Sequence, residues 1–165
     1  MADLPLLLLY TAWANRLLYG TLAAAPASVI DVARPGRRAG VRGTLGHIWL
    51  IAEVWKGHLT GEPHGFQARQ LEEAPALAEL QRRQATVDDW YVAHASQLDA
   101  ERLAQPVDFT FIGGGEGRML RSQILLHVVN HATYHRGYVA DMLYESGLKP
   151  PTMDLPVYLR EAGTG

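Results

Sequence analysis

The chain has no cysteine among its 165 residues. This absence excludes disulfides, thiolate metal sites and a cysteine nucleophile, and it is compatible with a reducing compartment. Long apolar runs are also missing: the run at residues 4–9 is far shorter than the roughly 20 apolar residues of a membrane span, and Asp3 stands where an export signal would carry a basic residue. We therefore expect a cytoplasmic protein without membrane contact.

A large excess of charge of either sign is missing as well. Charged residues make up 19% of the chain, its formal net charge is -2, and 48% of its residues are hydrophobic, which excludes a disordered tail or a strongly basic polyanion binder. Four arginines share a segment with proline and glycine but have no interleaved aromatics, so we expect a solvated loop and no nucleic-acid partner. They are Arg34, Arg37, Arg38 and Arg42.

Nucleotide-binding motifs are absent too. The glycine-rich stretch "GGGEG" at residues 113–117 lacks the spacing of GxGxxG or GxxxxGK[ST]. A chain of this length is about one domain long, so we expect a single domain over residues 1–165.

Apolar residues recur at helical spacing in four long stretches, separated by segments that contain proline and glycine. Thr44 is a candidate N-cap, Pro75 a first-turn residue and Gly147 a C-terminal cap. The helices are expected at about residues 4–24, 45–59, 75–103 and 120–146.

Strand signals are confined to "PVDFTFIGGGEGRM", residues 106–119, where alternating apolar residues precede three glycines. We expect at most a small hairpin there, before the last helix. The fold class is therefore all-α, a four-helix bundle, and a bundle core is a natural place for a site built from facing helices.

Histidines are concentrated in the last of these helices. The stretch "LLHVVNHATYHRGY" places His127, His131 and His135 four residues apart, so they form a row on one helical face. Any adjacent pair can chelate one metal ion, but a third ligand must then come from another element. The best candidate is His47, which lies among the apolar residues of "TLGHIWL", where an unpaired imidazole would be costly to bury.

The residues alone leave other interpretations open. A single histidine on an apolar face, such as His47, is more often a hydrogen-bonded core residue than a ligand, and the row of three can equally be a polar stripe. Spacing does not choose between the two adjacent pairs of the row. His58 and His64 lie in or near a loop and are expected to be solvated, whereas His94 can face either the core or the solvent.

Several stretches resemble one known family. "HVVNHATYHRGYVADMLYESGLKPPTMDLPVYLR", residues 127–160, is similar to the C-terminal signature of the DinB family of the DinB/YfiT-like superfamily. "YTAWANRLL" and "GTLGHIWLIAEVW" resemble that family's first and second helices, so the resemblance covers nearly the whole chain. It implies a four-helix bundle with up-down-down-up connectivity, usually a homodimer.

The resemblance also implies a divalent metal ion, typically nickel or zinc, held by three histidines. The ligands that it assigns in this chain are His47, His131 and His135. Pocket neighbours of these ligands would be His127, Asn130 and Tyr134.

Function follows from the same resemblance. Members of the superfamily include transferases and isomerases that use low-molecular-weight thiols, and a metal with an open position suits that chemistry because it lowers the pKa of a bound thiol. A metal-dependent hydrolase is the alternative, but no carboxylate is an obvious general base, since Glu53 lies six residues after His47 and away from its face. A non-catalytic, stress-related metal-binding protein is the third possibility.

Overall fold

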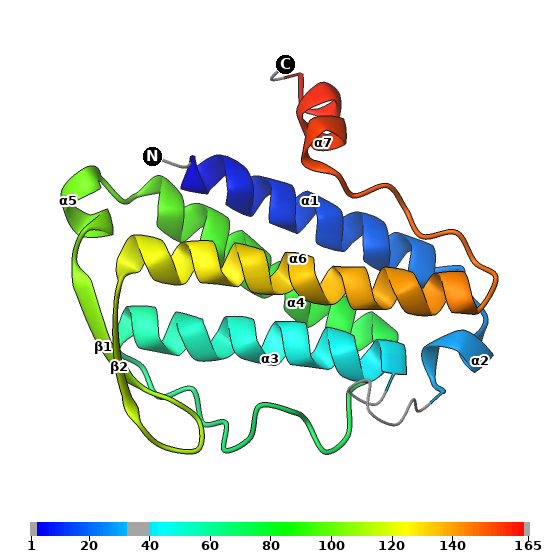
Figure 1. The fold of residues 1–165 in the computed structure, drawn as a ribbon, viewed down its shortest axis with the longest axis horizontal. Helices are drawn as coiled ribbons and strands as arrows, with labels where there is room; N and C mark the ends of the chain where they lie inside the picture. Colours follow the sequence, from blue (N-terminus) through cyan, green and yellow to red (C-terminus); the bar gives the residue numbers. More distant parts are fainter. Residues whose placement is uncertain (1–2, 33–39, 164–165) are drawn as a thin grey trace.

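Four long helices make up the body of the protein in the computed structural model, which describes residues 3–32 and 40–163 (Figure 1). These helices are α1 (Leu4–Ala23), α3 (Gly40–Thr60), α4 (Leu77–Ser96) and α6 (Arg121–Glu145). The smaller elements are α2 (Ala27–Ile30), α5 (Ala100–Leu103), the antiparallel strands β1 (Pro106–Thr110) and β2 (Glu116–Leu120), and α7 (Leu155–Glu161). The expected all-α fold with a short hairpin before the last long helix is confirmed. Within the described ranges, no helix combines the length and apolar character that crossing a membrane requires.

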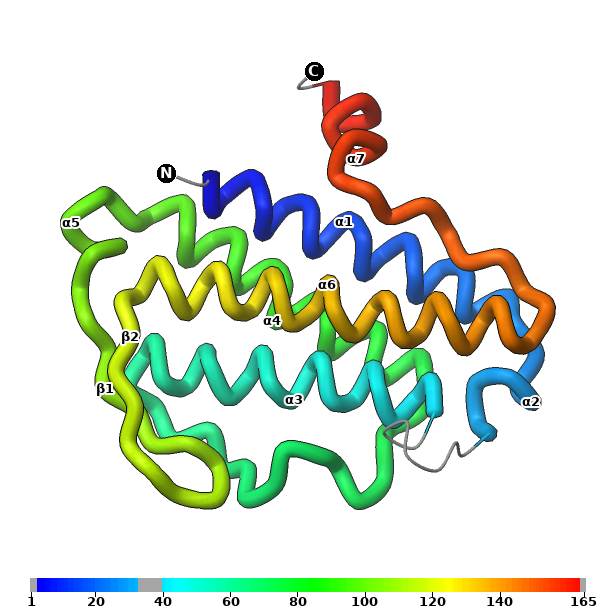
Figure 2. The backbone as a smooth tube through the Cα atoms, viewed as in Figure 1, coloured from blue at the N-terminus to red at the C-terminus, as the bar shows by residue number. Residues whose placement is uncertain are grey.

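The long helices run up, down, down and up. Figures 1 and 2 show α1 and α6 running in one direction and α3 and α4 in the other. The buried core agrees with this, because one cluster joins Leu8 of α1 to Leu59 near the end of α3, while another joins Leu22 of α1 to Val41 near its start. The neighbours α3 and α4 are therefore parallel, and the connection at residues 61–76 must return along the length of α3.

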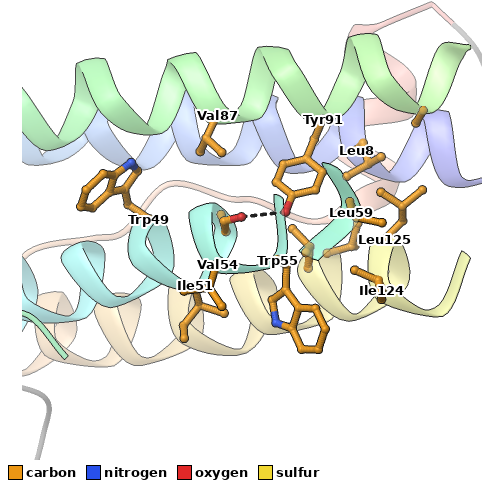
Figure 3. Close-up of a cluster of buried hydrophobic side chains, with 14 of the residues drawn as sticks. Leu8, Trp49, Ile51, Val54, Trp55, Leu59, Val87, Tyr91, Ile124 and Leu125 are labelled. Carbon is orange, nitrogen blue, oxygen red and sulfur yellow. Dashed lines mark hydrogen bonds between the residues drawn. The ribbon is translucent and has the colours of Figure 1, made fainter. Parts of the chain in front are cut away.

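The core between α3 and α4 combines apolar packing with one buried hydrogen bond (Figure 3). Tyr91 of α4 is almost fully buried, and its hydroxyl donates to the carbonyl oxygen of Ala52 at 2.7 Å. On the other side of α3, Trp55 points toward α6. The inner part of α3 is thus fixed on both sides.

A buried polar network ties together α1, α4 and α6. The guanidinium of Arg136 donates to the side-chain oxygen of Asn15 at 3.0 Å, and the Asn15 amide donates to Asp88 at 2.8 Å. Gln84 donates to the second oxygen of Asp88, also at 2.8 Å. Burial raises the pKa of Asp88 to about 6, even though these two amides and the charge of Arg136 act to lower it.

The boundaries expected for the third helix, residues 75–103, were wrong at both ends. The helix begins at Leu77, and it stops at Ser96, after which α5 forms separately. The break has a local cause, because the Asp99 carboxylate accepts the N–H of Arg102 at 2.8 Å and caps a new helix there.

The start of the second long helix was also misplaced. α3 begins at Gly40, so Thr44 lies inside it and its hydroxyl donates to the Gly40 carbonyl at 2.8 Å instead of capping the helix. Arg42 is helical and pairs with Asp31 at 2.8 Å. The other three arginines of the expected loop, Arg34, Arg37 and Arg38, lie outside the described residues.

Candidate metal centre

Three imidazoles from two helices meet in the bundle. His47 lies in the first half of α3, and His131 and His135 lie one turn apart on its neighbour α6. The candidate ligand atoms of all three lie within 4.8 Å of one another, and the Nε2 atoms of His47 and His131 are 3.1 Å apart. His47 and His135 are buried and His131 is half-buried. The structure thus brings together the three histidines that the resemblance assigned as ligands.

The orientation of His47 is set by a backbone group of the long connection. Its Nδ1 lies 2.6 Å from the carbonyl oxygen of Arg69. A carbonyl can only accept, so Nδ1 carries the hydrogen and the neutral ring keeps its lone pair on Nε2, the atom that faces His131. This arrangement is the usual one for a metal-binding histidine, whose second nitrogen donates to a carbonyl or carboxylate.

Glycines on α3 let the connection come close enough to make this bond. A Cβ atom added at Gly46 would lie 3.2 Å from the Leu71 side chain and 3.5 Å from that of Ala74. Beside it, the Gln70 side chain donates to the carbonyl oxygen of Gly43 at 3.1 Å. The connection therefore packs directly on the small-residue face of α3, with Arg69 next to His47.

The donor set fits a divalent metal ion. Imidazole nitrogens bind zinc at about 2.0–2.1 Å, so two ligands of one ion lie about 3.3 Å apart, close to the separation of His47 and His131. Neutral imidazoles suit zinc or nickel and leave the charge of either ion uncompensated. The residues His47, His131 and His135 could together hold such an ion.

An open cavity of about 490 Å³ adjoins the three histidines. Part of its wall is apolar and comes from α3 and from the turn of the β1–β2 hairpin, which contributes Phe111 and Ile112. The polar residues of the wall are histidines, Arg69 and Tyr134, and none of the described lining residues is a carboxylate. An ion at the three histidines would therefore face a cavity without negatively charged side chains.

Two further histidines line this cavity on either side of a tryptophan. The ring centroids of His58 and His127 lie 5.3 and 5.1 Å from that of Trp55. Burial lowers the pKa of both imidazoles, and the neighbouring His64 lowers that of His58 further. His58 and His64 were expected to be solvated, but both are half-buried.

The expected pocket neighbours are placed differently from one another. His127 and Tyr134 line the cavity, and the Tyr134 hydroxyl lies 2.6 Å from that of Tyr138. Asn130 is exposed and is not among the lining residues. Glu53 contacts Lys56 at 3.5 Å and lies outside the cavity.

The sequence interpretation overlooked the residues that loops contribute to the cavity. Arg69 comes from the connection between α3 and α4, and Phe111 and Ile112 come from the hairpin turn. The connection has no periodic pattern that indicates which side chains face inward, and the alternation in the hairpin does not indicate which helices it packs against. The one available signal was the set of glycines on α3, including Gly43 and Gly46, which permits a close approach of another segment.

Comparisons with known proteins agree with the resemblance. The sequence model of the DinB family matches residues 1–165. Protein DinB of Bacillus subtilis (strain 168) is 26% identical over 156 residues, which cover 91% of this chain and 90% of that protein. A DinB-like protein from Bacillus cereus ATCC 10987, known from a crystal structure, has a TM-score of 0.59 and 18% identity, with 84% of this chain and 89% of that chain covered. The structural match supports the fold.

Proposed function

Because this chain belongs to the DinB family, we propose that it is a metal-dependent transferase that activates a low-molecular-weight thiol. The metal ligands would be His47, His131 and His135, and the ion nickel or zinc. The observation that carries the proposal is the convergence of three imidazoles beside an open cavity whose described lining includes no carboxylate.

The cosubstrate follows from the composition of the chain. A divalent ion at this site would lower the pKa of a bound thiol and so favour its thiolate. The chain has no cysteine, so the sulfur must come from a small molecule. In this step the thiol gives its proton to solvent water, its sulfur forms a bond to an electrophilic carbon, and the leaving group departs with the electron pair of the bond that breaks.

The residues of the chain have supporting roles in this proposal. Arg69 holds His47 through its carbonyl, which keeps Nε2 directed at the site. The apolar wall, including Trp55, limits the access of water to the thiolate. No carboxylate is among the described lining residues, so a metal-activated water would have to use an imidazole of the wall, such as that of His127, as its general base.

Metal analysis of protein purified without a histidine tag tests whether these histidines bind a metal ion, which the transferase, the hydrolase and the non-catalytic interpretation all require. We expect wild type to retain about one ion per chain, and His47→Ala and His131→Ala to retain far less. The matched control is His94→Ala, because His94 stacks on Trp90, away from the cavity. Equal nickel or zinc content in all four proteins would show that the site is wrongly assigned.

Activity assays separate the reaction classes. The metal-loaded protein is incubated with glutathione or N-acetylcysteine and 1-chloro-2,4-dinitrobenzene, and in parallel with p-nitrophenyl acetate. Thiol-dependent loss of chloride that is abolished in His131→Ala supports the transferase. Ester hydrolysis without thiol would indicate the hydrolase, and inactivity in both assays would leave a non-catalytic metal protein.

A further inference from the structure

The cavity beside the three histidines has a charge pattern that metal binding does not explain. Arg69 is one of the residues that line the cavity, and no described lining residue is acidic. The described part of the chain contains no ion pair that engages Arg69, whereas other arginines such as Arg82 and Arg118 are paired with carboxylates. A bound divalent ion would add to this positive potential, so the cavity favours anionic ligands.

Arg69 is fixed next to the metal centre by its own backbone. Its carbonyl oxygen lies 2.6 Å from Nδ1 of His47, and the next residue, Gln70, bonds to Gly43 of α3 at 3.1 Å. The backbone of Arg69 is thereby held beside His47, while its side chain is exposed. A planar guanidinium pairs with a carboxylate through two parallel hydrogen bonds, a geometry that a lysine cannot reproduce.

Besides its histidines and Tyr134, the cavity wall has an apolar part. Ile51, Val54 and Trp55 contribute from α3, and Phe111 and Ile112 from the hairpin turn. Phe111 is 51% exposed although it is a large aromatic side chain, so it offers contact area that the fold itself leaves uncovered. An apolar or aromatic group placed against this wall would bury area on both surfaces.

We propose that the substrate of this cavity is a small organic acid, with a carboxylate that pairs with Arg69 and an apolar or aromatic body that lies against Trp55 and Phe111. The inference rests on the proposed function, because it names the substrate class of the same site. Amines are disfavoured by the ion and the guanidinium together, and neutral analogues forgo the pairing with Arg69.

Four probes and calorimetric titration test this selectivity: 4-phenylbutanoate, its amide, the corresponding amine, and butanoate. We expect 4-phenylbutanoate to bind at least about 10-fold more tightly than the amide or butanoate, and the amine not to bind. Because a carboxylate can also bind a metal ion, each titration is repeated on metal-free protein. The preference for the acid over the amide should be smaller there and still depend on Arg69.

Variants assign the preference to particular side chains. Arg69→Gln keeps the backbone carbonyl that holds His47 and, in metal-free protein, should abolish the difference between acid and amide, whereas Arg69→Lys should retain part of it. The matched control is Arg102→Gln on α5, which lies outside the cavity and should bind like wild type. Phe111→Ala should weaken 4-phenylbutanoate several-fold and leave butanoate unchanged.

The outcomes distinguish this inference from the proposed function. Acid and amide that bind equally, discrimination that survives in metal-free Arg69→Gln, or no binding of any probe at millimolar concentration would each overturn the inference. If the protein binds metal but shows no discrimination, only the inference fails. If it binds no metal yet discriminates through Arg69, the proposed function fails, and of the inference only the preference of the cavity for organic acids stands.

Discussion

Nδ1 of His47 lies 2.6 Å from the carbonyl oxygen of Arg69, so a helix residue and a loop residue share one hydrogen bond at the candidate metal centre. The acceptor is a backbone atom, and substitution of the Arg69 side chain leaves it in place. What removes the bond is displacement of the connecting segment from α3. The site therefore depends on the packing of residues 69–74 against the glycines of that helix.

Gly46→Val should weaken metal binding by about 10–100-fold, the usual effect of losing the partner of a metal-bound histidine. A Cβ atom at this position already lies 3.2 Å from Leu71, and the two methyl groups of valine would push the segment outward. Competition with a chromophoric chelator measures the zinc affinity. Gly20→Val on α1 is the control, because nothing lies within 4 Å of a Cβ atom there. Equal affinity of Gly46→Val and wild type would contradict the role of the segment.

Metal should stabilise the folded protein. A ligand that binds only the native state adds about 2.7 kcal/mol to the free energy of unfolding at 100 times its Kd. We expect zinc or nickel to raise the Tm of wild type and of His94→Ala but not that of His135→Ala. The comparison uses the shift on adding metal, because removal of the buried His135 ring also lowers the Tm of the metal-free protein. An equal shift in all three proteins would place the ion elsewhere.

Stability should fall as pH rises through the range in which Asp88 titrates. Its pKa is about 6 in the folded protein against an ordinary value of 3.8, so the native state binds more protons than the unfolded state between these values. The Asp88 contribution to the free energy of unfolding should thus decrease by about 2 kcal/mol from pH 4 to pH 7 and be nearly constant above that. Urea denaturation at a series of pH values measures it.

A matched pair of variants isolates this contribution from those of other groups. Asp88→Asn should lose that part of the pH dependence, whereas Asp89→Asn, at the exposed neighbouring position, should keep most of it. If the free energy of unfolding of the two variants depended on pH to the same extent, the buried network around Arg136 would not be the source of this pH dependence.

Gly147→Ala should destabilise the protein by about 1 kcal/mol. Gly147 has a φ of +75° at the end of α6, where the next N–H, that of Leu148, bonds to the Leu143 carbonyl at 2.9 Å. Gly137→Ala in the same helix meets no atom within 4 Å and should instead raise stability by about 0.5–1 kcal/mol. Thermal denaturation of both variants tests the contrast, and two changes of the same sign would contradict it.

Helical periodicity predicted the long elements of the fold because it reflects which residues are buried. The last long helix was expected at residues 120–146 and spans Arg121–Glu145, with Gly147 as its cap. Boundaries set by single polar side chains were missed. The carboxylate of Asp99 starts a separate helix inside an uninterrupted apolar pattern, and the Thr44 hydroxyl bonds within α3 instead of capping it.

In the candidate site, too, the residues on helices could be predicted from the sequence and those on loops could not. His131 and His135 could be placed together from the sequence because they are one turn apart on a helix, and His47 could be proposed as their partner. Choosing this pair over His127 and His131 required the family resemblance. Arg69 could not be predicted, since its position depends on how a loop packs against Gly43 and Gly46 across the molecule.

The parallel arrangement of α3 and α4 has an evolutionary consequence. It requires a long return segment, and that segment together with the hairpin turn supplies Arg69, Phe111 and Ile112 to the cavity, whereas the three candidate metal ligands come from helices. Loops accept insertions and substitutions more readily than packed helices. Related proteins can therefore change which molecules they accept by altering these two connections while inheriting the histidines unchanged.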